Sequence, residues 1–215
     1  MTQYKNYIFD LDGTLLNTLG DLAASTNYSL RYHHLPERTI EEVRCFVGNG
    51  VGKLIERAVP QGSPSDLVTE VLSVFRRHYL EHSLDTTVPY PGVMETLSQL
   101  KKRGAHIAVV SNKLQAGVTE LCNHFFSELV DVAIGEREGI RRKPSPDMVL
   151  EALRQLDADA SDSVYIGDSD VDIATARNSG VPCISVLWGF RDQNFLLEHG
   201  ATCLIHDCTE LLTGC

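Results

Sequence analysis

At 215 residues, with 43% apolar residues, the chain can form one large domain or a core domain with a smaller insertion. Its formal net charge of -10 argues against non-specific binding to nucleic acid or an anionic membrane, because both need a basic surface. No apolar run reaches the roughly 18 residues of a membrane helix, and the start of the chain lacks a signal-peptide pattern, so we expect a soluble, cytoplasmic protein.

The first apolar run, YIFDLD at residues 7–12, predicts a central strand. Alternate residues of a strand point to the same face, so the carboxylates of Asp10 and Asp12 are expected to lie close together. Such a pair needs a partner, either a divalent cation with oxygen ligands or a reaction that uses two carboxylates with different pKa values. The alternative is a simple turn, because Asp12 precedes Gly13 and Asp-Gly is common turn chemistry.

Residues from about 19 to 82 carry apolar residues at helical spacing and indicate a helical insertion. We therefore expect a core domain of residues 1–16 and 84–215, with a helical domain of residues 17–83 inserted after the first strand. The predicted helices of the insertion cover residues 21–33, 39–47, 50–59 and 65–82.

After the insertion, short apolar strands alternate with amphipathic helices. This alternation predicts an α/β fold, with a Rossmann-like three-layer α/β/α core and a central parallel sheet covered on both faces. The predicted strands are residues 106–112, 130–135, 163–170, 182–189 and 201–206. The predicted helices are residues 93–104, 145–156 and 171–180.

Polar residues follow several of these strands. Asp10 and Asp12 end the first strand, Ser111 ends the next, and Asp168 ends a later one. Lys143 stands just before a helix and is expected at the same edge, because ligands of open parallel sheets bind beyond the carboxyl ends of the strands. Three carboxylates could hold Mg²⁺ there, while Ser111, Lys143 and backbone N–H groups bind phosphoryl oxygens.

Four segments, in chain order, resemble the motifs of the haloacid dehalogenase superfamily of phosphohydrolases: DLDGT, VVSN, RKPSPD and GDSDVD. The resemblance spans nearly the whole chain. It implies that Asp10 is the nucleophile that forms an aspartyl phosphate, and that Asp12 is the general acid and then the base, with its backbone carbonyl on the metal. It also implies that Asp168 completes the Mg²⁺ site with Asp10 and Asp12, and that Asp172 acts indirectly.

The same resemblance gives roles to the remaining motif residues. Ser111 and Lys143 would bind the phosphoryl group as catalytic residues. Thr14 and Asn112 would bind and orient the substrate, and Ser169 would support the site beside Asp172.

The helical insertion resembles the cap of the family's first subclass, which closes over small substrates and excludes water. Within it, FVGNGVGKLIERA closely resembles a loop and helix of the phosphoglycolate phosphatase branch. Gly48 and Gly50 would let backbone N–H groups approach an anion, Asn49 would add a donor, and Lys53 a positive charge. The alternative is a glycine-rich hinge between two helices.

The resemblance implies a Mg²⁺-dependent phosphatase of a small phosphorylated metabolite, first 2-phosphoglycolate, acting as a monomer or homodimer without nucleic-acid or membrane partners. Enzymes with the same mechanism remain open: an inorganic pyrophosphatase, a sugar-phosphate or nucleotide phosphatase, or a β-phosphoglucomutase. A phospho-accepting signalling module is an alternative of a different class, although such modules lack a cap and have no use for Asp12.

The six cysteines form no CxxC pair, so reduced thiols are expected. The tail CLIHDC, residues 203–208, has a spacing that does not fit a zinc finger or ribbon.

Overall fold

The computed structural model describes residues 4–213 and divides the chain into two units. One unit contains the chain up to Leu16 and from Pro89 onward, and the other spans Asn17–Val88. Two short strands near this boundary, β2 and β3, form a small sheet of their own; they are Leu16–Asn17 and Val88–Pro89.

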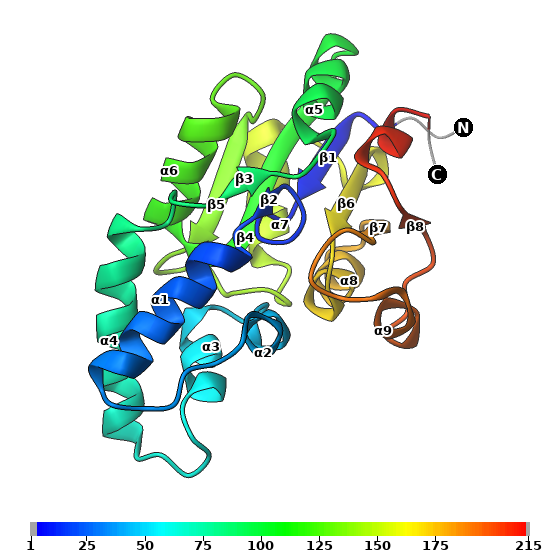
Figure 1. The fold of residues 1–215 in the computed structure, drawn as a ribbon. Helices are drawn as coiled ribbons and strands as arrows, with labels where there is room; N and C mark the ends of the chain where they lie inside the picture. Colours follow the sequence, from blue (N-terminus) through cyan, green and yellow to red (C-terminus); the bar gives the residue numbers. More distant parts are fainter. Residues whose placement is uncertain (1–3, 214–215) are drawn as a thin grey trace. The chain divides into compact units, whose positions relative to one another are not determined.

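The first unit is built on a sheet that, within the described residues, has six strands in the order β5-β4-β1-β6-β7-β8 (Figure 1). The strand pairs are parallel, as predicted. The strands are β1 (Asn6–Phe9), β4 (His106–Leu114), β5 (Val132–Glu136), β6 (Ser163–Gly167), β7 (Cys183–Val186) and β8 (Leu204–Ile205).

Helices flank this sheet and complete the Rossmann-like α/β fold. Helices α7 and α8 cover one face through a buried cluster that includes Ile8, Val110, Met148 and Ala176. Helices α5 and α6 pack against β4, and right-handed crossovers place them on the other face. The helices are α5 (Val93–Lys102), α6 (Gln115–Phe126), α7 (Asp147–Leu156), α8 (Asp170–Ser179) and α9 (Gln193–Glu198), with 3₁₀ turns at Ala160–Asp162 and Cys208–Leu212.

The first strand is shorter than predicted. Strand β1 ends at Phe9, although the N–H of Asp10 still donates to the carbonyl of Ile166 at 2.8 Å. The chain then turns, because the carbonyl of Leu11 accepts from the N–H groups of residues 14, 15 and 16 at 3.3, 3.0 and 3.0 Å. Asp12 therefore lies in a loop, and the strand alternation expected to align it with Asp10 does not apply.

The second unit is helical, as the spacing of its apolar residues predicted. Its helices are α1 (Leu19–Tyr32), α2 (Ile40–Phe46), α3 (Val51–Ala58) and α4 (Ser65–Glu81). Helices α1 and α4 pack against each other, and their buried side chains include Leu22, Leu30, Val71 and Phe75. Thr39 and Glu42 form a capping box that starts α2.

Two further findings concern membrane-spanning helices and the state of the cysteines. Among residues 4–213, no helix is both long and apolar enough to cross a bilayer. Cys45, Cys122, Cys183 and Cys208 are free, whereas Cys203 is disulfide-bonded, so the expectation of reduced thiols is wrong at Cys203. The sixth cysteine, at position 215, lies outside the described residues.

Candidate functional site

The candidate site lies where β1, β4 and β6 end. Strand β1 is central, and β4 and β6 pair with its two edges, so the chain reverses its direction across the sheet at this point. Asp10 follows β1, Ser111 lies near the end of β4, and Asp168 follows β6. Such a switch point is where open α/β sheets bind ligands.

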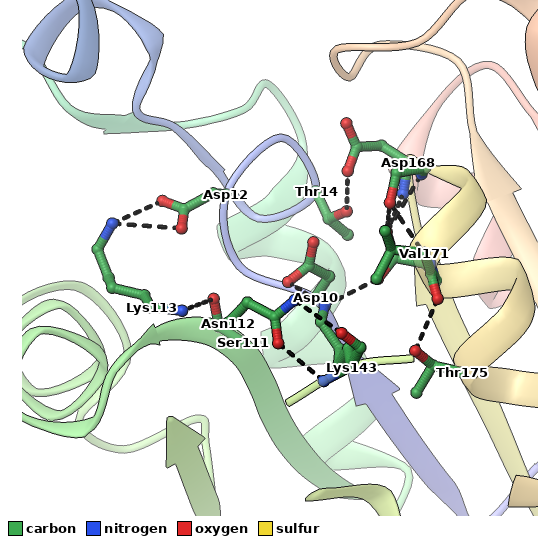
Figure 2. A network of polar contacts seen from close by, with 12 residues as sticks. Asp10, Asp12, Thr14, Ser111, Asn112, Lys113, Lys143, Asp168, Val171 and Thr175 are labelled. Carbon is green, nitrogen blue, oxygen red and sulfur yellow. Dashed lines mark hydrogen bonds and ion pairs between the residues drawn. The ribbon is translucent and has the colours of Figure 1, made fainter. Parts of the chain in front are cut away.

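Three buried carboxylates meet there. Asp10, Asp168 and Asp172 are 8%, 1% and 0% exposed, and one oxygen of each lies within 4.8 Å of the others. The ammonium of Lys143, itself 5% exposed, lies 2.7 Å from Oδ1 of Asp10 and 2.8 Å from Oδ1 of Asp172. Figure 2 shows Asp10, Asp168 and Lys143 in this network. The structure therefore brings together three residues, Asp10, Lys143 and Asp168, that the sequence analysis selected from distant parts of the chain.

The charges of the cluster do not balance. Burial, and then repulsion by Asp172, raise the pKa of Asp10 well above its ordinary value. The same two causes raise the pKa of Asp168 to about 7. Burial alone would lower the pKa of Lys143, but the carboxylates of Asp10 and Asp172 outweigh it and raise that pKa. Because one ammonium faces three carboxylates, a divalent cation with oxygen ligands fits the site.

Asp172 differs from the other two carboxylates in how its oxygens are used. Its Oδ1 accepts from the hydroxyl of Tyr165 at 2.9 Å and from Lys143. Its Oδ2 accepts from the N–H groups of Asp168 and Ser169, at 3.3 and 3.1 Å, and from the Ser169 hydroxyl. Each oxygen of Asp172 thus accepts from at least two donors, whereas each oxygen of Asp168 accepts one hydrogen bond, from Thr14 or from Phe190. Asp172 is therefore better suited to holding its neighbours in place than to binding a cation, and Asp10 and Asp168 are the stronger ligand candidates.

The segment after β7 helps to hold Asp168 and the loop that contains Thr14. The N–H of Phe190 donates to Oδ2 of Asp168 at 2.7 Å, and the indole of Trp188 donates to the carbonyl of Thr14 at 2.9 Å. The Thr14 hydroxyl donates to Oδ1 of Asp168 at 3.4 Å. A backbone amide has no sequence signal, so this role of Phe190 could not be predicted.

Gly13 allows the loop to approach Asp168. Its φ of +91° is in the region that favours glycine, and a Cβ at this position would collide with the Asp168 carboxylate. The glycine of the first motif is therefore explained by space as well as by backbone conformation.

The side chain of Asp12 lies outside the carboxylate cluster. Its two oxygens lie 2.9 and 3.2 Å from the ammonium of Lys113, a residue that the sequence analysis did not select. In Figure 2 the Asp12 carboxylate points toward Lys113 and away from that of Asp10. The only sequence signal was a lysine at the end of an apolar strand, where a buried charge needs a partner.

Asn112 connects the end of β4 to the segment that contains Lys143. Its amide oxygen accepts from the N–H of Lys143 at 2.8 Å, and its amide nitrogen donates to the carbonyl of the same residue at 3.1 Å. The hydroxyl of Ser111 accepts from the N–H of Lys113 at 3.2 Å. Asn112 is therefore placed to position Lys143.

The other predicted residues belong to local structures. Ser169 caps α8 and forms a capping box with Asp172. In the second unit, Asn49 accepts from Arg57 at 2.7 Å, and the exposed ammonium of Lys53 lies 2.6 Å from Glu56. Gly48 and Gly50, which have φ of +123° and +81°, form the turn before α3.

Comparisons with known proteins show what the chain is similar to. Residues 7–186 match the profile of the haloacid dehalogenase-like hydrolases. A phosphoglycolate phosphatase of Caulobacter vibrioides is 36% identical over 96% of this chain and 92% of its own, and one of Pseudomonas syringae pv. syringae is 32% identical over 98% and 79%. A crystal structure from Lactobacillus delbrueckii subsp. bulgaricus, assigned as a phosphoglycolate phosphatase, has a TM-score of 0.92 at 36% identity and covers 97% of both chains.

Proposed function

Because this chain belongs to the haloacid dehalogenase-like hydrolases, we propose that it is a cytoplasmic, Mg²⁺-dependent phosphatase of a small phosphate monoester, with 2-phosphoglycolate as the first substrate to test. One observation carries the phosphatase chemistry. The buried carboxylate of Asp10 lies 2.7 Å from the buried ammonium of Lys143 and within 4.8 Å of Asp168. This arrangement suits a carboxylate nucleophile beside groups that can hold a phosphoryl group.

In this mechanism Asp10 attacks phosphorus, and the bond from phosphorus to the leaving oxygen breaks to give an aspartyl phosphate. Asp12 gives a proton to the leaving alkoxide, and later takes one from the water that hydrolyses the aspartyl phosphate. Bound Mg²⁺, held by Asp10, Asp168 and the backbone carbonyl of Asp12, would stabilise the negative charge of the phosphoryl oxygens.

The remaining residues position these groups. Lys143 and Ser111 bind phosphoryl oxygens, and Asn112 fixes the backbone of Lys143 through two hydrogen bonds. Asp172, Ser169 and Thr14 hold Lys143 and Asp168 in place.

The second unit is proposed to act as the cap that selects the substrate. Gly48, Asn49, Gly50 and Lys53 would bind the carboxylate of 2-phosphoglycolate through backbone N–H groups, an amide and an ammonium. The pair between Lys53 and Glu56 is exposed, and such surface pairs contribute little, so Lys53 can exchange partners at small cost. The names of the two bacterial relatives support this choice of substrate.

The test measures phosphate release from 2-phosphoglycolate, sugar phosphates, nucleoside monophosphates and pyrophosphate, with added Mg²⁺ and with EDTA. We expect the highest kcat/KM for 2-phosphoglycolate, and a loss of activity with EDTA that Mg²⁺ restores. A higher kcat/KM for pyrophosphate or a sugar phosphate would reassign the substrate, and activity that persists in EDTA would contradict the metal requirement.

A variant pair tests the nucleophile. Asp10→Asn is expected to abolish turnover and to leave the thermal melting temperature close to that of the wild type. The control is Asp170→Asn, because Asp170 is an acidic residue in the first turn of α8 that lies outside the carboxylate cluster. Retained turnover in Asp10→Asn would exclude Asp10 as the nucleophile.

A further inference from the structure

The two carboxylates of the DLD segment, residues 10–12, each pair with a different buried lysine. Asp10 pairs with Lys143, and Asp12 pairs with Lys113 (Figure 2). The side chain of Lys113 is 6% exposed and that of Asp12 is 16% exposed, so their pairing is far from an ordinary surface ion pair. Desolvated pairs of this kind hold a fixed geometry, because either charge alone would be costly to bury.

The position of Lys113 is set by its surroundings. A Cβ at Gly117, in the first turn of α6, would lie only 3.3 and 3.4 Å from Cδ and Cγ of Lys113. Gly117 thus provides the space along which the lysine stem runs. The backbone of Lys113 is held as well, because its N–H donates to the hydroxyl of Ser111.

The orientation of the Asp12 carboxylate toward Lys113 matters for the proposed proton transfer. Both oxygens of Asp12 face the Lys113 ammonium, and Asp12 is not part of the cluster formed by Asp10, Asp168 and Asp172. A carboxylate that joined that cluster would add a fourth negative charge and would compete for the cation. Lys113 therefore keeps the two carboxylates of one short loop in different surroundings.

We propose that Lys113 is a positioning residue for proton transfer to the leaving group, and this inference rests on the proposed function. Lys113 holds Asp12 apart from the carboxylate cluster, so that Asp12 serves the leaving oxygen while Asp10 attacks phosphorus. Before the ester reacts, Asp12 takes up one proton from solvent. When the phosphorus–oxygen bond breaks, its electron pair stays on the leaving oxygen, which takes that proton from Asp12. The carboxylate of Asp12 that remains is balanced by Lys113 until the attacking water returns a proton to it.

The test compares esters whose leaving groups differ in their need for a proton. In Lys113→Met we expect kcat for 2-phosphoglycolate, or for the best alkyl phosphate of the panel, to fall about tenfold or more. For p-nitrophenyl phosphate, whose leaving group departs without a proton, we expect a fall of less than about twofold. KM should change little for either ester, because the phosphoryl-binding residues are intact.

Gly117→Ala is a second variant that leaves the Lys113 charge in place and displaces only its stem. It should show the same preference for p-nitrophenyl phosphate to a smaller degree. Lys101→Met is the matched control, since Lys101 also pairs with a carboxylate, that of Asp131 at 2.7 Å, but the two side chains are more exposed, at 26% and 33%. This control should leave kcat for both esters unchanged.

A double variant shows whether Lys113 acts through Asp12. In an Asp12→Asn background, Lys113→Met should cause no further loss with the alkyl phosphate, because the group that it positions is gone. Equal losses for both esters, or a further loss in the double variant, would overturn the role of Lys113 while leaving the phosphatase assignment intact. A wild type that hydrolyses none of the esters would refute the proposed function, and this inference with it.

Discussion

At the scale of single side chains, Tyr165 shows how the buried lysine is held. Its hydroxyl accepts from Lys143 at 3.0 Å and donates to Asp172 at 2.9 Å, and the whole residue is inaccessible to solvent. Hydrogen bonds to charged groups contribute more than neutral ones. The hydroxyl therefore links the lysine to one of its two carboxylate partners.

Tyr165→Phe removes only this hydroxyl. We expect it to lower the free energy of unfolding by about 2 kcal/mol, measured by urea denaturation, because two charged groups each lose one hydrogen bond. Turnover should fall only a few-fold, since Lys143 still contacts Asp10 and Asp172.

The control for this substitution is Tyr32→Phe, at a tyrosine that is 59% exposed. Its unfolding free energy should match that of the wild type. An equally stable Tyr165→Phe would mean that the hydroxyl merely fills space.

Residue by residue, the sequence was most informative where an acidic or basic side chain ends a strand. That rule brought Asp10, Asp168 and Lys143 into one cluster, and the structure places them there. The same rule could not predict the position of Asp12. The turn after Leu11 is formed by backbone hydrogen bonds, and no pattern of side chains predicts them. The partnership with Lys113 follows from that turn and was missed for the same reason.

At the scale of secondary-structure elements, Asp21 ties the start of α1 to the far end of the second unit. Its buried carboxylate accepts from the N–H and the hydroxyl of both Thr86 and Thr87. Four hydrogen bonds to the Asp21 carboxylate thus connect helix α1 to a loop that follows 65 residues later in the chain.

Asp21→Ala would leave these donors unpaired. We expect the free energy of unfolding of the second unit to fall by about 3 kcal/mol, because a buried network loses its acceptor. Native-state hydrogen exchange would show this as faster exchange in α1 and α4 with little change in the sheet.

Asp66→Ala is the matched control for this substitution. Asp66 is also an acidic residue in the first turn of a helix, α4, but it is exposed. Exchange rates that changed equally in both variants would indicate a general helix-terminus effect instead of the buried network.

The predicted helices agree with the structure to within about two residues in the second unit, but two helices of the first unit were not predicted. Helix α6 begins after Leu114, without a side-chain cap and without an acidic residue in its first turn, so the usual start signals are absent. Helix α9 has only six residues, which is too short for a periodic pattern. Neither helix has a local sequence pattern that predicts it. The parallel pairing of β4 and β5 nevertheless requires a crossover connection between them, and α6 is that connection.

At the scale of the whole molecule, the carboxylate cluster couples stability to pH. The pKa values of Asp10 and Asp168 are raised above their ordinary values, so the folded protein binds more protons than the unfolded chain. Without metal, this stabilisation is complete below the ordinary pKa of aspartic acid, near 3.8, and is lost as the pH rises through the raised values, which for Asp168 is about 7.

In EDTA we therefore expect the contribution of these two residues to lower the melting temperature as the pH rises from about 5 to 8. Saturating Mg²⁺ should reverse this loss, because a ligand that binds only the folded state at 100 times its Kd adds about 2.7 kcal/mol. Thermal melts across this pH range, with and without Mg²⁺, make the comparison.

Asp168→Asn should reduce both the pH effect and the gain from Mg²⁺, because it removes one titrating carboxylate and one proposed ligand. A melting temperature that does not respond to Mg²⁺ at any pH would contradict a cation site at the cluster.

The central place of β1 also matters during synthesis of the chain. Strand β1 is made well before its partner β6, which begins at Ser163, so one edge of β1 stays unpaired until more than 150 further residues have been added. At roughly 5–20 residues per second, this delay lasts on the order of ten seconds or more. A nascent chain therefore carries an apolar strand with one unpaired edge for that time, and the carboxylate cluster is complete only after Asp168 and Asp172 have been added.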